Sequence, residues 1–317
     1  MHLIQLKIRG LGNLPQTDWI QVKNGINLFR CDGQAAGEKI LQTIQTLNPP
    51  YDCLEEQPFQ DLPTQTVTSS GFAKNIMAWK RTIVFGIFDS SAPLVRELGG
   101  ITPYLYEADR IEVGRRLDCS RWFNFVELAS STRWSEISGA MTSLYENHAG
   151  RGSHAAEASK IIAGLTAIDR IKGDNARILA NWLSRLKSDQ PELEHIDTLL
   201  EKVLRSERFS EARTLLGMRM PLFIDLKPGD RDRPLRVETI ERLNDQTRLQ
   251  PIILLNLLGG QQPADAEEVT AFLQAIAGRY QCLCFVDQPH PQLCLELHIH
   301  TGKISQGVQA EPAPPAD

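Results

Sequence analysis

Residues 25–47 read GINLFRCDGQAAGEKILQTIQTL, and this stretch decides which fold the chain can adopt. Ile26–Phe29 is a short apolar run of the kind found in β-strands. A glycine-containing loop, Cys31–Gly37, follows it. From Lys39 to Leu47 the apolar residues recur at helical spacing, and Pro49 cannot continue a helix. The stretch therefore predicts a strand, a glycine loop and a helix in direct succession.

Strand-rich and helical regions alternate along the rest of the chain. Further strands are predicted over residues 3–9, 19–22, 81–88, 103–106, 110–113 and 123–128. Residues 135–215 carry the 3.6-residue apolar spacing of three or four helices. In the last third, strands are predicted over 222–225, 251–255, 282–286 and 293–299, and helices over 237–243 and 266–276. Such alternation is typical of an α/β fold with a parallel sheet.

Composition narrows the class of protein. The 317 residues are 42% hydrophobic and 23% charged, which is ordinary for a globular chain and excludes wholesale disorder. The net charge of −5 shows no overall basic excess of the kind expected for a standalone nucleic-acid binder. The chain has six cysteines and no CxxC pair, and its first residues do not form an apolar leader. We therefore expect a cytoplasmic protein whose thiols are reduced. No apolar run is long enough for a membrane span.

The N-terminal residues also resemble a known family. LKIRGLGNL at 6–14, followed by the stretch 25–47, is similar to the start of the ATPase heads of the RecF, SMC and ABC group. The resemblance covers residues 1–47 and implies a two-lobed P-loop NTPase fold, ABC/SMC head-like, with a helical insert. We expect an N-terminal lobe over 1–134, the insert over 135–215, a C-terminal α/β lobe over 216–305 and a disordered tail over 306–317.

The glycine loop departs from the family pattern. A working P-loop, GxxxxGK[ST], cradles phosphates with backbone N–H groups, while its Lys reaches the phosphates and its hydroxyl holds Mg²⁺. Aligned through its flanks, the chain has Gly37 in place of the Lys and Glu38 in place of the Ser/Thr. Aligned on Gly33 and Gly37, the loop is one residue short, with Lys39 retained and Ile40 at the hydroxyl position. Both alignments lack the Mg²⁺ hydroxyl, and the Glu38 carboxylate would repel phosphate.

The C-terminal motifs can be aligned in two ways. In the first, Asp225 is the acidic Walker B residue, Leu226 replaces the catalytic Glu, and Asn256 stands near the switch position. In the second, which we prefer, Gly229 belongs to the signature loop, Asn256 replaces the Walker B Asp, and Asp287 replaces the switch His. The resemblance thus implies that the activating Glu and the switch His are both absent.

These departures imply a degenerate head that has lost hydrolysis. We expect a non-hydrolysing scaffold or regulatory subunit of a DNA-related complex, for repair or defence, with ATP and Mg²⁺ as the cofactors that the family would bind. The partner implied is a second ATPase head or a second copy of the chain, with DNA implied by family analogy and no membrane contact. The remnant nucleotide-binding residues are Gly33, Gly37, Glu38, Lys39, Asp225, Gly229, Asn256 and Asp287. No catalytic or metal-ligating residue is assigned.

Two other functions stay open on the sequence. An active but divergent ATPase could use Lys39 on phosphate and Asp225 or Asp287 on metal. A protein-binding module could work without nucleotide and use the helical residues 135–215 as its interface. Separately, Arg115-Arg116 and Arg121-Trp122 mix cations with an aromatic ring, as nucleic-acid contacts do, although exposed arginines are common on any surface.

Overall fold

A computed structural model of the chain describes residues 1–9, 16–50, 80–148, 155–191, 193, 195–259, 263–287 and 300–303. The predicted loop over 51–70, strand over 293–299 and tail over 306–317 lie outside these residues. The predicted α/β fold is confirmed. By their contacts the residues form two compact units. Unit 1 comprises residues 1–91, 110–123 and 219–317, and unit 2 comprises residues 92–109 and 124–218.

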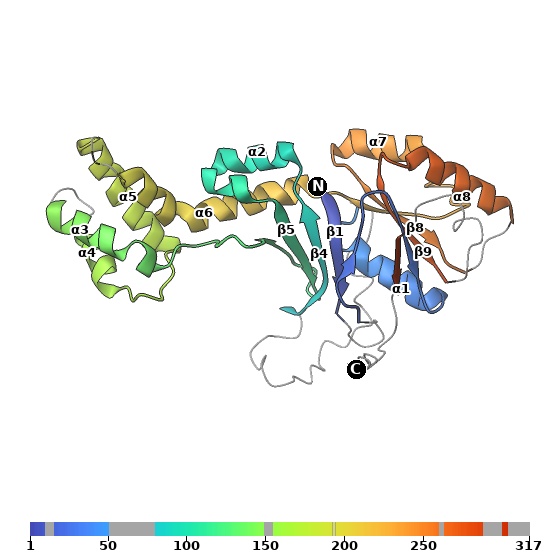
Figure 1. Ribbon diagram of the computed structural model, residues 1–317, viewed down its shortest axis with the longest axis horizontal. Helices are drawn as coiled ribbons and strands as arrows, with labels where there is room; N and C mark the ends of the chain where they lie inside the picture. The colour runs from blue at the N-terminus through green and yellow to red at the C-terminus, as the bar shows by residue number, and fades with distance from the viewer. Residues whose placement is uncertain are drawn as a thin grey trace, which may run out of the picture. The chain divides into compact units, whose positions relative to one another are not determined.

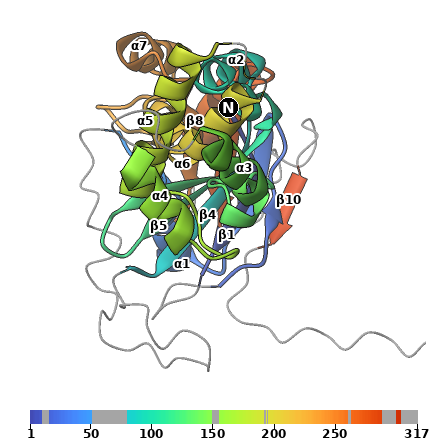
Figure 2. The same ribbon diagram turned by 90° about the vertical axis from the view of Figure 1, so that its left-hand side faces the viewer.

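A five-stranded parallel sheet forms the centre of unit 1. Its order is β10-β3-β9-β8-β7, with β10 at one edge (Figure 2). The strands are β3 (Ile26–Arg30), β7 (Phe223–Leu226), β8 (Ile252–Leu257), β9 (Gln281–Val286) and β10 (His300–Lys303). The predicted strand of the glycine-loop stretch therefore pairs directly with the predicted strand over 282–286, more than two hundred residues later.

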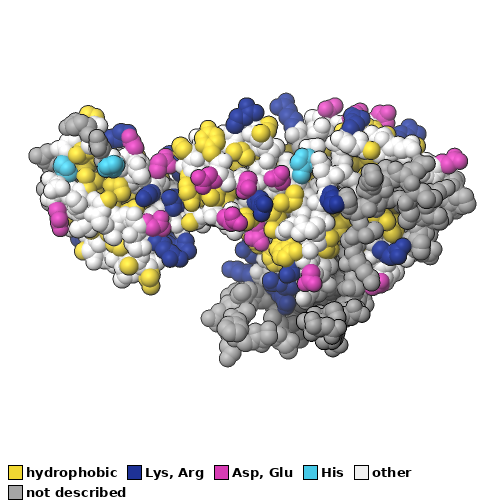
Figure 3. Space-filling model, in the orientation of Figure 1, with side chains coloured by type: hydrophobic (Ala, Val, Ile, Leu, Met, Phe, Trp, Pro, Cys, Tyr) yellow, Lys and Arg dark blue, Asp and Glu magenta, His cyan; other side chains and the backbone are white. Residues whose placement is uncertain are grey.

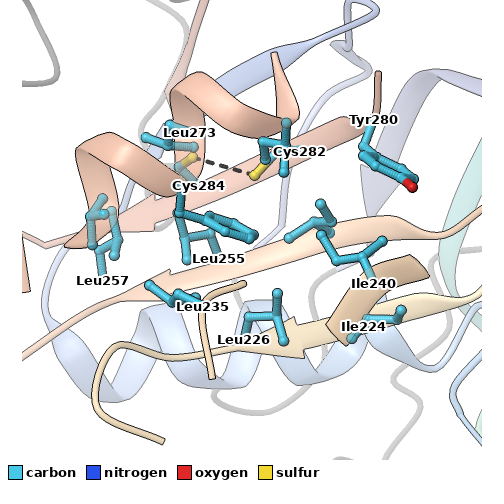
Figure 4. Close-up of a cluster of buried hydrophobic side chains, with 14 of the residues drawn as sticks. Ile224, Leu226, Leu235, Ile240, Leu255, Leu257, Leu273, Tyr280, Cys282 and Cys284 are labelled. Atoms are coloured by element: carbon cyan, nitrogen blue, oxygen red, sulfur yellow. Dashed lines mark hydrogen bonds between the residues drawn. The ribbon is translucent and has the colours of Figure 1, made fainter. Parts of the chain in front are cut away.

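Helices cover both faces of this sheet (Figure 1). Helix α1 (Gln34–Gln45) lies on one face, and α7 (Val237–Thr247) and α8 (Pro263–Ile276) lie on the other. Strand residues such as Leu255 and Cys284 point toward Ile240 and Leu273 of these helices (Figure 4). Because both faces are buried, every residue of β8 and β9 is buried, which explains why these strands are apolar apart from Asn256 and Gln281.

An antiparallel sheet with the order β2-β1-β4-β5-β6 completes unit 1. Its strands are β1 (His2–Ile8), β2 (Ile20–Gln21), β4 (Thr82–Asp89), β5 (Arg110–Arg116) and β6 (Arg121–Phe125). One face packs inward, where Phe88 meets Phe223 of β7 with ring centroids 6.3 Å apart. The Gln281 amide joins the two sheets by accepting from Leu3 N–H and donating to its carbonyl, at 2.9 and 2.7 Å.

Unit 2 is helical. It contains α2 (Ala92–Ile101), the 3₁₀ helices η3 (Pro103–Glu107) and η4 (Trp134–Glu136), and the helices α3 (Ser138–His148), α4 (Ala155–Gly164), α5 (Gly173–Asp189) and α6 (Ile196–Arg219). Its core gathers around the buried Trp182 and Leu183 of α5. The helices predicted over 135–215 are confirmed, and residues 92–109 cluster with them. No helix within the described ranges is both long and apolar enough to cross a bilayer.

Two local predictions are wrong. Residues 103–106 are not a strand but part of η3, because Pro103 favours the first helical position and Tyr104 packs on α6. The centroid of the Tyr104 ring lies 6.0 Å from that of Phe209, and the Arg205 guanidinium lies over the Tyr104 ring at 4.3 Å from its centroid. The loop predicted over Cys31–Gly37 is shorter than expected, because α1 already begins at Gln34.

Candidate nucleotide site at the carboxyl edge of the parallel sheet

The predicted site residues gather at one edge of unit 1. The carboxyl ends of parallel strands meet at the same edge of a sheet, which is where open α/β folds bind ligands. Asp225 lies in β7, Asn256 lies in β8, and Asp287 directly follows β9. The remaining predicted residues lie next to these strand ends: Gly33 after β3, Gly37, Glu38 and Lys39 in α1, and Gly229 after β7.

The connection from β3 to α1 is tight. Only Cys31, Asp32 and Gly33 separate Arg30, the last residue of β3, from Gln34, the first of α1. Gly33 caps the helix with φ 98° and ψ 159°, a conformation that favours glycine. The Gly37 N–H donates to the Gly33 carbonyl at 3.1 Å. Gly33 to Gly37 thus close a helical turn, where a P-loop would wrap its backbone around phosphates.

Leu258, just beyond β8, packs onto this turn. A β-carbon at Gly37 would lie 2.6 Å from a methyl group of Leu258 and 3.1 Å from Cβ of Cys31. The Leu258 side chain is buried. Next to it, a β-carbon at Gly259 would lie 2.8 Å from Oε1 of Gln34. The residues after β8 therefore cover the start of α1 with an apolar side chain and a backbone turn.

Polar groups from β8 and β9 hold these residues in place. The Leu258 N–H donates to Oδ1 of Asn256 at 3.2 Å, so the amide in the preferred Walker B position caps its own strand end. The Gly259 N–H donates to Oδ2 of Asp287 at 3.1 Å. The other carboxylate oxygen of Asp287 is buried and has no hydrogen-bond partner among the described residues. Asn256 and Asp287 thus both accept hydrogen bonds from the loop that contains Leu258.

The thiol of Cys31 lies in this packed region. Burial first, and then the negative charges of Asp32 and Asp287, raise the pKa of Cys31 to about 12. A thiol with this pKa is protonated at neutral pH and is a poor nucleophile. Cys31 is therefore a packing residue of the site.

Asp225 occupies the other side of the site, near α1. The pKa of Asp225 is raised to about 6, chiefly by burial; the charges of Arg233 and Lys227 lower it, and those of Asp230 and Glu38 raise it. Oδ1 of Asp225 is buried, and no group in the described part of the chain forms a hydrogen bond with it. The Glu38 carboxylate is thus close enough to Asp225 for its charge to raise the pKa of that carboxyl slightly.

The loop after β7 contains the predicted Gly229. Gly229 has φ 73°, which favours glycine, and Oδ1 of Asp230 accepts from Asp232 N–H at 2.9 Å and Arg233 N–H at 3.3 Å. The predicted signature position is thus an ordered turn. Its charged residues contribute to the environment of Asp225.

Glu38 and Lys39 lie in the first turns of α1. Oε1 of Glu38 accepts from Nε2 of Gln34 at 2.9 Å, and the Lys39 carbonyl accepts from Oγ1 of Thr43 at 2.7 Å. The first N–H groups of α1 remain outside the helical hydrogen-bond ladder, which is the general basis for anion binding at a helix start. Among the described residues, no group of three or more His, Cys, Asp and Glu side chains could hold a metal ion.

The sequence did not reveal the residues that fill the site. Leu258, Cys31 and Gln34 carry no motif, and their roles depend on the pairing of β3 with β9 and β8. Leu258 directly follows the buried strand β8, but single apolar residues are common on protein surfaces, so the sequence carried no specific signal for its packing.

No protein-family model and no curated protein matches the chain. Among solved structures, it is similar to the SMC head domain from Thermotoga maritima, at 10% identity, with 95% of this chain and 94% of that chain covered and a TM-score of 0.33. It is also similar to the recombination mediator protein RecF with ATP, at 12% identity, covering 97% and 98% with a TM-score of 0.33. A third is an SMC head bound to the C-winged helix domain of ScpA, at 12% identity, covering 91% and 90% with a TM-score of 0.31.

Proposed function

We propose that the chain is a degenerate RecF/SMC/ABC-like ATPase head that acts as a non-hydrolysing scaffold or regulatory subunit of a DNA-related complex. One observation carries the proposal. The residues from Gly33 to Gly37, which correspond to the phosphate loop, form a helical turn closed by a 3.1 Å hydrogen bond and covered by Leu258. The Gly37 N–H is already bonded within this turn, and Leu258 packs on Gly37, so this N–H is not offered to a phosphate; only the N–H groups that precede it in α1 stay outside the helical ladder.

The chemistry of the surrounding residues supports the same conclusion. Hydrolysis of ATP requires a metal that bridges phosphates and a residue that positions the attacking water. The chain has Ile40 or Glu38 where the Mg²⁺ hydroxyl belongs, and Asn256 and Leu257 where the Walker B carboxylates belong. Asn256 instead accepts a hydrogen bond from Leu258 N–H. Each replacement removes a different part of the catalytic machinery.

The family that the sequence resembles suggests a role in which the chain acts beside another subunit. Heads of this group assemble their nucleotide sites between two subunits, so a head without hydrolysis could still support a partner. The partner proposed is an intact ATPase head or a second copy of the chain. The DNA-related setting and the cytoplasmic location belong to the same proposal.

A turnover assay tests the loss of hydrolysis. Phosphate release from ATP with Mg²⁺ should not exceed the background of a matched sample, and Lys39→Ala should not change it. Lys160→Ala, on the exposed surface of α4, controls for the loss of one positive charge. Mg²⁺-dependent release that disappears in Lys39→Ala but persists in Lys160→Ala would contradict the proposal.

One observation favours the active, divergent ATPase as a second candidate. Asp225 and Asp287 each have a buried carboxylate oxygen to which none of the residues that the structure describes donates a hydrogen bond. A metal with its phosphate could satisfy such an oxygen. This candidate predicts that Asp225→Asn or Asp287→Asn abolishes any phosphate release observed in the wild-type chain, whereas the degenerate head predicts no release for either variant to abolish.

A further inference from the structure

The antiparallel sheet of unit 1 has a second face, opposite to the one that packs inward. Neighbouring residues of a strand point to opposite faces. In β4, Val84 and Gly86 are buried, and Phe85 between them is only partly buried. Lys7 of β1 and Gly114 of β5 lie directly opposite Phe85 in the two neighbouring strands. These three residues therefore mark a line across the outer face.

Aromatic rings follow this line. The ring of Phe85 lies 6.2 Å from that of Trp19 on one side and 6.2 Å from that of Trp122 on the other. Trp122 lies over Gly114, where an added β-carbon would meet the indole at 2.4 Å. Nε1 of Trp122 donates to Oγ1 of Thr82 at 3.0 Å, which fixes the indole in its orientation. Trp19 is 37% exposed.

Positive charges accompany the rings. Nζ of Lys7 lies 5.7 Å from the Trp19 ring centroid, and the guanidinium of Arg9 lies 5.1 Å from that of Phe85. Burial and then the nearby charge of Arg81 lower the pKa of Arg9, so two guanidinium groups repel each other here. Figure 3 shows Lys and Arg side chains gathered at the lower end of this sheet.

The structure divides the arginine and tryptophan motif noted in the sequence. Arg116 lies opposite Thr82 and therefore belongs to the outer face with Trp122. Arg121 instead points inward, where its Nη1 donates to the Leu47 carbonyl at 3.2 Å and to Oδ1 of Asn48 at the end of α1. Arg115 is buried. Arg115 and Arg121 are thus part of the inward-facing side of the sheet, whereas Arg116 and Trp122 lie on the outer face with the other aromatic rings.

We infer that this outer face binds single-stranded nucleic acid. Aromatic rings provide stacking surfaces for bases, and the cations beside them neutralise phosphates. A single strand exposes the faces of its bases, whereas a duplex hides them, so a row of rings favours the single strand. The inference extends the DNA-related part of the proposed function to a particular surface, and it does not depend on the state of the nucleotide site.

Fluorescence anisotropy with the full chain tests the inference. The probes are labelled oligothymidylate and oligouridylate of about 20 nucleotides, a length that spans one or more typical single-strand sites, and a duplex of equal length. We expect both single strands to bind and the duplex to bind more weakly. Trp19→Ala should raise the dissociation constant by about tenfold, the effect of losing one stacked base. Lys7→Gln with Arg9→Gln should reduce the salt slope by about 0.7 for each lost phosphate contact.

Matched variants separate stacking from general effects. Tyr106→Ala removes an aromatic side chain that is 57% exposed in unit 2, and Arg242→Gln removes an exposed charge of α7. Both should bind like the wild type. Trp19→Phe should retain binding because it retains a ring, which also shows that a loss in Trp19→Ala is not a folding defect.

Four outcomes would overturn the inference. The first is undetectable binding of both single strands at low salt. The second is equal or tighter binding of the duplex. The third is equal weakening by Trp19→Ala and Tyr106→Ala. The fourth is displacement of the probe by poly-glutamate as readily as by unlabelled oligothymidylate, which would indicate an acidic protein partner. A negative result in these nucleic-acid titrations does not contradict the proposed loss of ATP hydrolysis, which the ATP assays test separately.

Discussion

Leu258 occupies the space into which a side chain at Gly37 would extend, with one methyl group 2.6 Å from the β-carbon position. Gly37 lies in the first turns of α1, and Leu258 follows β8. In the family pattern, one region supplies the phosphate loop and the other follows Walker B. In this chain the two regions pack directly on each other.

The packing of Gly37 against Leu258 predicts a non-additive pair of substitutions. Gly37→Ala should destabilise the chain by about 1–2 kcal/mol, because overpacking outweighs the gain in helix propensity. In a Leu258→Ala background the same substitution should be neutral or stabilising, because the obstructing methyl groups are gone. Denaturant unfolding of the four proteins of the cycle measures the coupling.

Gly139 provides the control for that cycle. It lies in α3, and an added β-carbon there would meet nothing within 4 Å. Gly139→Ala should therefore stabilise the chain by up to about 1 kcal/mol. Stabilisation by Gly37→Ala in the wild-type background as well would show that Leu258 does not pack on the turn.

Cys31 should resist thiol reagents. Its pKa is raised to about 12 by burial and by the charges of Asp32 and Asp287, so the reactive thiolate is scarce at pH 8. Alkylation of the folded chain, followed by peptide mapping, should modify the partly exposed Cys119 well before Cys31. Equal rates at the two cysteines in the folded chain would mean that the loop after β3 opens readily.

Asp225 should make the stability of the chain depend on pH. Its pKa is raised from 3.8 to about 6, so between these values the folded chain holds a proton that the unfolded chain releases. The free energy of unfolding therefore falls as the pH rises from about 4 to about 6, by about 3 kcal/mol in total. Asp225→Asn should be more stable than the wild type by about 1–3 kcal/mol above pH 7, and similar to it near pH 4.

Urea unfolding at the two pH values measures this difference. Asp245→Asn, at an exposed position of α7, controls for the removal of one negative charge. A destabilised Asp225→Asn above pH 7 would mean that the carboxylate is held by favourable contacts in its charged form. That result would favour a cation-binding role for Asp225.

The sequence predicted the strands and helices of the sheet core well, because burial on both faces leaves a clear mark. The run over residues 251–255 and the run over 282–286 are buried throughout, as their unbroken apolar sequence indicated. The 3₁₀ helix η3 was missed because Tyr104 and Tyr106 favour strands locally. Its packing against α6, through Thr102 donating to Glu201 at 2.7 Å, is a tertiary effect.

The sequence indicated residues that the fold brings together at the candidate site, but it did not indicate how the site is packed. Motif positions identified Gly37, Asn256 and Asp287, which the fold brings to one edge of the sheet. Periodicity does not show that α1 begins three residues before Gly37, since Gln34 to Ala36 follow a capping glycine and suit a helix as well as a loop. The packing of Leu258 depends on strand pairing between distant parts of the chain, which local patterns do not encode.

Calorimetric titration of ATP into the purified chain, with and without Mg²⁺, tests the central claim most directly, with Lys39→Ala alongside the wild type. The closed turn at Gly33 to Gly37 predicts binding no tighter than millimolar, insensitive to Mg²⁺ and unchanged by Lys39→Ala. Micromolar, Mg²⁺-dependent binding that is lost in Lys39→Ala would contradict it and show that the site opens to accept nucleotide.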